Sequence, residues 1–140
     1  MGRIMAIDYG ARRTGLAVTD SERIIAHALT TVETGVVMEY IAQYCEREDV
    51  DVFVVGEARQ KDGSPSESAP LIEAFVKQLQ ARFPGYAIAR VDERFTSKMA
   101  FQTMIDSGLK KKARREKGTI DSIAATIMLQ DYMKRIENGL

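Results

Sequence analysis

The opening of the chain, residues 3–20, constrains the fold more than any other stretch. An apolar run from Ile4 to Ile7 ends at Asp8, and a second apolar run, residues 16–18, follows a connection bracketed by Gly10 and Gly15. This pattern predicts two antiparallel strands joined by a short turn. A carboxylate that ends a buried strand needs exposure at the sheet edge or a cation to bind, unless it only caps the turn. Both roles are open for Asp8 at this point.

The rest of the chain changes from strand patterns to an alternation of strands and helices. The expected elements are a strand at 24–32, a helix at 36–48, a strand at 51–56, a polar loop at 57–66, a helix at 70–83, a strand at 86–91, a helix capped by Thr96 or Ser97, and a last helix capped by Thr119. Three hairpin-type strands followed by this alternation predict an α/β fold, with a five-stranded mixed sheet flanked by helices. We expect one domain spanning residues 1–140, because neither repeats nor low-complexity linkers interrupt the pattern.

Composition excludes several classes of protein. No apolar run approaches the roughly 20 residues of a membrane span, and the start lacks the apolar segment of a signal peptide. Cys45 is the single cysteine and His27 the single histidine. An internal disulfide and the usual zinc clusters are therefore excluded, and a reducing cytoplasm is the expected location. Any metal must be held by oxygen ligands.

Charge is balanced over the chain but not along it. The formal net charge is zero, yet residues 90–117 hold nine Lys and Arg against four Asp and Glu. A neutral protein with such a distribution can present one basic surface to a polyanion. The densest part is formed by Lys110, Lys111, Lys112, Arg114, Arg115 and Lys117. Such a run is either a solvated linker or a grip on phosphate groups, and its position just before Asp121 favours the grip.

Three carboxylates occupy positions in the expected strands and helix where an apolar, buried residue would be more usual. Asp8 ends the first strand, Glu93 follows the fifth, and Asp121 lies in the expected first turn of the last helix. Acids that converge repel one another unless a cation neutralises them, and hard ions such as Mg²⁺ or Mn²⁺ prefer oxygen ligands. Two such ions about 4 Å apart can activate water for phosphodiester cleavage. Each acid also has an ordinary role, as a turn residue, a surface ion-pair partner and a helix-dipole acid respectively, and spacing does not prove that they meet.

Five ordered motifs together resemble the YqgF (RuvX) family. They are Asp8-x-Gly10-x-x-Arg13-x-Gly15-x-Ala17, Val54-Val55-Gly56, Asp62-Gly63, residues 92–97 (Asp-Glu-Arg-Phe-Thr-Ser), and Lys117-Gly118-Thr119-Ile120-Asp121-Ser122-x-Ala124-Ala125. The resemblance implies a RuvC-like nuclease with a ribonuclease H-like fold, acting in the bacterial cytoplasm on the 5′ end of pre-16S rRNA. An older description of the family is Holliday-junction resolvase. The resemblance also implies that Asp8, Glu93 and Asp121 are the catalytic acids and bind Mg²⁺ or Mn²⁺.

The sequence leaves alternatives open for the residues that contact the substrate, for the substrate itself and for the oligomeric state. Arg13 and Arg94 lie beside the acids in sequence, and each could orient a scissile phosphate or form an ion pair with those acids. The family's usual Val-Gly-x-Pro is Val55-Gly56-Glu57-Ala58 here, which should loosen the loop and adds an acid near the expected site. RNA and branched DNA both remain candidate substrates, as does a non-catalytic role in nucleic-acid binding. Junction resolution would need two active sites and hence a dimer, so monomer and dimer are both open.

Overall fold

Five strands and three α-helices make up the part of the chain that is described. A computed structural model describes residues 2–57, 68–92 and 117–137, with side chains from residue 121 onward in the last range. The strands are β1 (Arg3–Asp8), β2 (Arg13–Thr19), β3 (Ala26–Glu33), β4 (Val50–Glu57) and β5 (Ala87–Asp92). The helices are the 3₁₀-helix η1 (Thr34–Val36), α1 (Val37–Arg47), α2 (Ala69–Arg82) and α5 (Lys117–Glu137).

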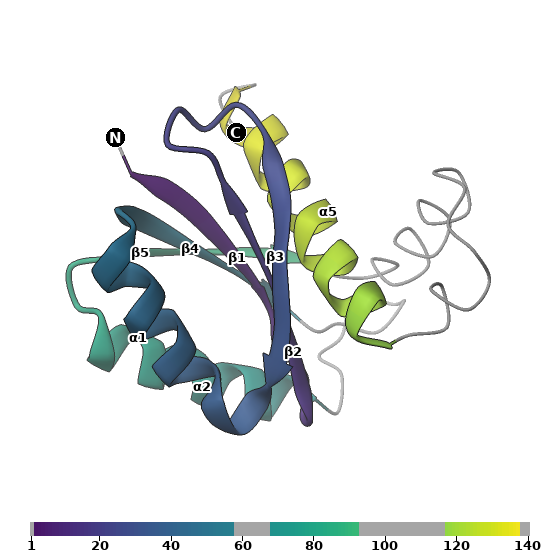
Figure 1. The fold of residues 1–140 in the computed structure, drawn as a ribbon. Coiled ribbons are helices and arrows are strands. Elements are labelled where there is room, and N and C mark those ends of the chain that lie inside the picture. The colour runs from purple at the N-terminus through teal and green to yellow at the C-terminus, as the bar shows by residue number, and fades with distance from the viewer. Residues whose placement is uncertain (1, 58–67, 93–116, 138–140) are drawn as a thin grey trace.

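The strands form one mixed sheet in the order β3-β2-β1-β4-β5. β1, β2 and β3 are antiparallel neighbours, whereas β4 runs parallel to β1 and β5 runs parallel to β4. The predicted five-stranded mixed sheet is therefore confirmed. α1 and α2 cover one face of the sheet, and α5 crosses the opposite face over β1, β2 and β3 (Figure 1). The predicted helix at residues 96–108 lies outside the described residues.

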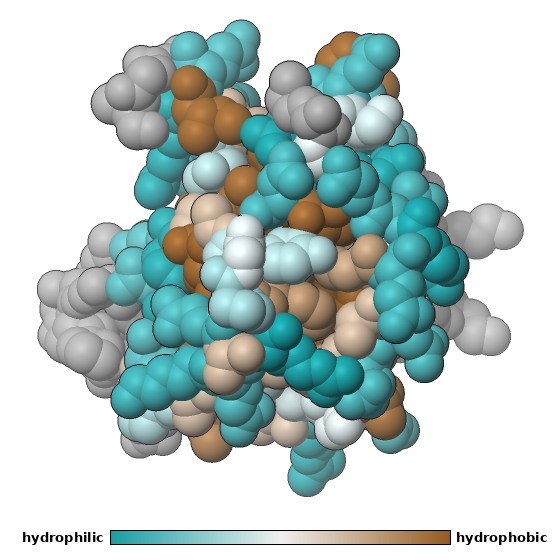
Figure 2. All heavy atoms as spheres, turned by 90° about the vertical axis from the view of Figure 1, so that its left-hand side faces the viewer, coloured by the Kyte–Doolittle hydropathy of each residue, from teal (hydrophilic) through white to brown (hydrophobic). Residues whose placement is uncertain are grey.

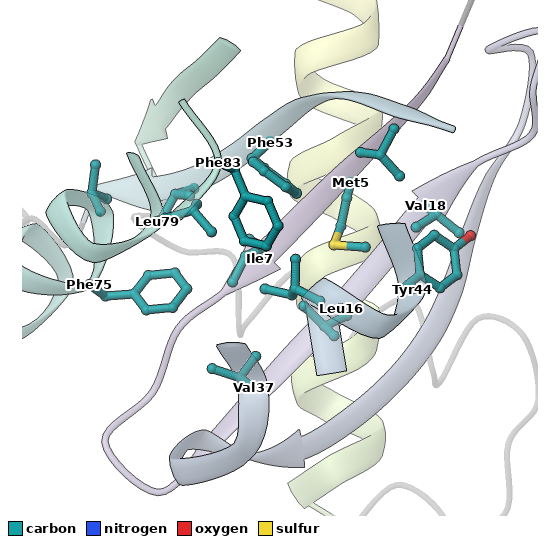
Figure 3. Packing of buried hydrophobic residues seen from close by; sticks show 14 of the residues in the cluster. Met5, Ile7, Leu16, Val18, Val37, Tyr44, Phe53, Phe75, Leu79 and Phe83 are labelled. Atoms are coloured by element: carbon teal, nitrogen blue, oxygen red, sulfur yellow. The ribbon is translucent and has the colours of Figure 1, made fainter. Parts of the chain in front are cut away.

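Alternation along the strands divides the core into two layers. On β1, Met5 and Ile7 belong to the cluster under α1 and α2, while Ile4 and Ala6 belong to the cluster under α5. The first cluster is the larger, and its members converge from both helices and the sheet (Figure 3). β4 lies between β1 and β5 and has fully buried residues on both faces, as its near-continuous apolar run predicts.

The two helices on the first face follow the sequence pattern closely. α1 starts one residue after the predicted residue 36 and ends one before the predicted 48, and Pro70 lies in the first turn of α2, where a missing N–H is tolerated. Cys45 is half-buried on α1, and burial raises the pKa of its thiol, which fits a packing role. Figure 2 shows this side of the molecule, where teal hydrophilic side chains cover most of the surface between smaller brown patches.

The third strand begins later than predicted. β3 starts at Ala26, and Ile24 and Ile25 lie in the preceding turn, 65% and 54% exposed. The Asp20 carboxylate accepts hydrogen bonds from the backbone N–H groups of both isoleucines, at 2.7 and 3.0 Å. These bonds lower the pKa of Asp20. The Asp20 side chain thus makes a local contact with the backbone that competes with extension of the strand.

The last helix begins earlier than predicted. α5 starts at Lys117, so Thr119 is not its cap, and Asp121 lies beyond the first turn. Glycine and threonine are weak helix formers, but the difference from other residues is only about 1 kcal/mol or less. Packing of a 21-residue helix on the sheet outweighs that difference. The interpretation of Asp121 as a first-turn acid that interacts with the helix dipole is therefore wrong. None of the described helices is both long and apolar enough to cross a bilayer.

Candidate active site

The carboxyl ends of the three parallel strands lie at one edge of the sheet. Asp8 is the last residue of β1, Glu57 of β4 and Asp92 of β5, and these strands are parallel neighbours. Open α/β sheets place their ligand sites outside this edge. Asp8 therefore ends a buried strand at the position where a functional carboxylate is expected.

Gly15 brings the last helix to the end of the first strand. It is the direct partner of Asp8 in the antiparallel pairing of β1 and β2. A Cβ atom at Gly15 would overlap the backbone carbonyl of Asp121 and lie 2.9 Å from the backbone nitrogen of Ser122. Glycine is thus required here because the α5 backbone rests on the β2 backbone. The structure therefore places Asp8 and Asp121 on either side of a single residue.

Glu57 lies on the other face of the sheet from Asp8, because side chains alternate between the two faces along a strand. Ile4 and Ala6 face α5, so Asp8 follows them on that side of the sheet. Phe53 and Val55 belong to the opposite cluster, and Glu57 follows them toward the α1 and α2 side. Glu57 lies at the same edge as Asp8, but it is not the additional acid beside Asp8 that the loop sequence suggested. Counting by two from Phe53 would have revealed this.

Arg13 contacts Asp121 directly. Its Nε donates a hydrogen bond to Oδ2 of Asp121 at 3.1 Å, and the side chains are 40% and 26% exposed. Of the two roles open for Arg13, the structure shows the ion pair with an acid. An ion pair this accessible to solvent contributes about 1 kcal/mol or less to stability. The ion pair matters because Asp121 is one of the expected metal ligands.

Thr34 fastens the connection between β1 and β2, a role the sequence analysis missed. Its hydroxyl donates to the carbonyl of Gly10 at 2.6 Å, and its backbone N–H donates to the carbonyl of Arg12 at 2.9 Å. The hydroxyls of Thr14 and Thr34 are also hydrogen-bonded, at 2.9 Å. The only signal was a threonine beside a glycine at a strand end, which indicates a turn but not a partner more than twenty positions away. The loop that precedes Arg13 is thereby held in place.

We expect Thr34→Val to lower the free energy of unfolding by about 1–3 kcal/mol, because it removes the partner of the fully buried Thr14 hydroxyl. Urea unfolding followed by circular dichroism measures the change. Thr30→Val is the matched control, since its hydroxyl makes only a 3.5 Å contact with the adjacent Thr31 carbonyl. Equal stability of the two variants would remove Thr34 as the anchor of this loop.

Most of the other predicted site residues lie outside the part of the chain that is described. These are Glu93, Arg94, Lys110, Lys111, Lys112, Arg114, Arg115 and Ala58. Lys117 is the first residue of α5, where only the backbone is described. Tyr9 and Phe95 are the aromatic residues next to Asp8 and Arg94 in sequence; Tyr9 stacks on Phe75 of α2 with ring centroids 4.6 Å apart, so it packs in the core. Phe95 lies outside the described residues.

The two acids that the structure describes at the candidate site offer only oxygen atoms as metal ligands. Asp8 and Asp121 are carboxylates, the ligand type that Mg²⁺ and Mn²⁺ prefer. Within residues 2–57, 68–92 and 117–137, no group of three or more Asp, Glu, His or Cys lies close enough to hold a metal ion. The donor chemistry of the described pair therefore fits a hard divalent cation, and a complete ligand set would need a further acid.

The fold belongs to the class of RuvC-like proteins. The chain superposes on Thermus thermophilus RuvC in complex with a Holliday junction substrate with a TM-score of 0.58 and 17% identity, covering 97% of this chain and 96% of that one. It superposes on the yeast mitochondrial Holliday junction resolvase Ydc2 with a TM-score of 0.52 and 12% identity, covering 99% and 85%. At these identities the likeness establishes the fold, a five-stranded ribonuclease H-like α/β architecture.

The sequence identifies the family within that class. The model of the family described as "RuvX: Holliday junction resolvase" matches residues 2–135. A protein of Flavobacterium psychrophilum is 55% identical over 135 residues, which cover 96% of this chain and 98% of that protein. One of Flavobacterium johnsoniae is 55% identical over 133 residues, covering 95% and 96%. Both relatives bear the name "Putative pre-16S rRNA nuclease". The chain belongs to the RuvX family, as its motifs predicted.

Proposed function

We propose that this chain is a nuclease domain that hydrolyses phosphodiester bonds in structured RNA. Its substrate would be the 5′ end of pre-16S rRNA in the bacterial cytoplasm. The observation that carries the proposal is the Gly15 contact, which sets Asp121 of α5 against the strand end that bears Asp8. Relatives 55% identical over nearly their whole length bear the name of such a nuclease, which supports the choice of substrate.

In this proposal Asp8, Glu93 and Asp121 hold Mg²⁺ or Mn²⁺. Glu93 directly follows Asp92, the last residue of β5, and Val91 two positions earlier belongs to the α5-side core, as Ala6 does two positions before Asp8. The position of Glu93 in the sequence, directly after the carboxyl end of β5, supports it as the third acid. Ions bound there would activate the attacking water and stabilise the leaving 3′ oxygen.

The protein's own residues supply position and electrostatics rather than a nucleophile. Asp8 and Asp121 present fixed negative oxygens from two rigid elements, a strand end and a helix packed across it. Arg13 brings a guanidinium to the same place, and its planar donors suit a phosphate group. Arg94 and the basic run 110–117 would extend the contact along the RNA backbone. In this arrangement the scissile phosphate would lie at the edge formed by the ends of the parallel strands.

A second candidate is cleavage of branched DNA. The family description names a Holliday junction resolvase, and the fold matches a RuvC solved with a junction. The same acids would serve, but cleavage of opposite strands would require a dimer. We choose RNA because both relatives bear the name of a pre-16S rRNA nuclease.

A direct comparison of substrates tests the proposal. We expect purified protein with Mg²⁺ or Mn²⁺ to cleave a pre-16S rRNA 5′ fragment at least about tenfold faster than a four-way DNA junction, and to stop in EDTA. Faster cleavage of the junction, with sedimentation as a dimer, would favour the resolvase. Salt-sensitive RNA binding without cleavage of either substrate would indicate a non-catalytic binding module.

A further inference from the structure

We propose that Arg13 is the internal counter-ion of Asp121 and competes with divalent metal for its carboxylate. The inference rests on the proposed function, since it assumes that Asp121 is a metal ligand. It goes beyond that function because it gives Arg13 control over metal affinity in addition to a contact with phosphate.

The contact involves one of the two carboxylate oxygens of Asp121 that a metal could use. Nε of Arg13 lies 3.1 Å from Oδ2 of Asp121. A cation coordinated by the same oxygen would sit within about 2.0–2.6 Å of it, depending on the ion. The guanidinium and the metal would then be like charges in direct proximity, which is unfavourable. Binding of metal should therefore displace the Arg13 side chain or weaken its hydrogen bond.

The position of Arg13 is set by the backbone. It is the first residue of β2 and pairs with Glu33 of β3, and the preceding loop is fastened by Thr34 through Gly10 and Arg12. Asp121 is equally constrained, because its backbone rests on Gly15. The ion pair thus joins two fixed points and is not a chance contact between two flexible surface chains.

The ion pair between Arg13 and Asp121 balances part of the negative charge at the candidate site. Asp8 and Asp121 are acids on either side of Gly15, and their negative charges repel each other when no cation lies between them. Arg13 supplies a positive charge while metal is absent. When metal takes over that role, the guanidinium is released beside the site and can bind the substrate phosphate. Metal loading and the phosphate contact of Arg13 would in this way be coupled.

Isothermal titration of the full chain with Mn²⁺ tests the inference without measuring activity. We expect Arg13→Gln to bind Mn²⁺ about tenfold more tightly than the wild type, a coupling of ordinary size for two linked ligands. Arg12→Gln is the matched control, because Arg12 is the exposed neighbour and its replacement removes the same charge. Its affinity should stay within about twofold of the wild type. Arg13→Lys, which keeps the charge, should restore weaker binding.

The outcomes separate this inference from the proposed function. Asp121→Asn should lose the Mn²⁺ site, and retention of wild-type Mn²⁺ affinity by this variant would overturn both proposals. Loss of the site in Asp121→Asn together with equal affinities of Arg13→Gln and Arg12→Gln would overturn only the role of Arg13. Arg13→Gln should also raise KM for the RNA while it tightens metal binding. Loss of folding would weaken both Mn²⁺ binding and RNA binding, so thermal unfolding of each variant is measured to show that the protein is folded.

Discussion

Asp8→Asn should reduce the rate of metal-dependent cleavage of a pre-16S rRNA fragment by about 10²–10³-fold, the usual cost of removing one electrostatic contact to a transition state. Asparagine keeps the size of the side chain and one oxygen, but it lacks the negative charge that binds a divalent ion. Asp8 ends β1 and is only partly buried, so the fold should tolerate the change. Single-turnover cleavage at saturating Mn²⁺ measures the loss.

Asp131→Asn is the control for Asp8→Asn. Asp131 lies near the other end of α5, is half-exposed and forms an ion pair with Arg135 one turn further along. Its replacement removes the same charge from the protein at a distance from the proposed site, so cleavage should stay at the wild-type rate. An Asp8→Asn protein as active as Asp131→Asn would remove Asp8 from the catalytic machinery. Matching thermal unfolding curves would show that any difference arises at the site.

The elements of the fold were predictable because their signals are local. Apolar runs mark β1 and β4, and both strands have buried residues on both faces of the sheet. Predictions failed where a single polar contact or tertiary packing decided a boundary. The Asp20 carboxylate holds Ile24 and Ile25 in a turn, and packing extends α5 back to Lys117. Neither effect is visible in hydrophobic periodicity.

The candidate site was only partly predictable for a different reason. A carboxylate at the end of a buried strand is recognisable from sequence, so Asp8 was a candidate from its own surroundings, with the role of a turn cap equally open. That the backbone of Asp121 lies against Gly15, the pairing partner of Asp8, depends on a contact between distant segments, which spacing does not encode. Only the resemblance to the family grouped Asp8 and Asp121 as expected site residues. The partner of Arg13 was open for the same reason, because both of its roles are compatible with the same sequence.

Gly15→Ala should have the second large effect, since it acts on the contact between the α5 backbone at Asp121 and the residue that pairs with Asp8. The added methyl group would overlap the Asp121 carbonyl, and α5 would have to move away from β2. Overpacking of this kind costs about 1–3 kcal/mol of stability. A displacement of about 1 Å between reacting groups can cost about 10²-fold in rate. We therefore expect a lower urea midpoint and, in the fraction that stays folded, much slower cleavage.

Gly85→Ala is the control for Gly15→Ala, because a Cβ at Gly85 would meet nothing within 4 Å. The same methyl group added there should leave cleavage unchanged, which separates the loss of glycine in general from the loss of this contact. Mn²⁺ titration adds a readout of geometry, since parting Asp121 from Asp8 should weaken metal binding as well as cleavage. A Gly15→Ala protein with wild-type stability and wild-type Mn²⁺ affinity would mean that α5 does not rest on β2 at this residue. The convergence of the two carboxylates, on which the nuclease proposal depends, would then lose its structural basis.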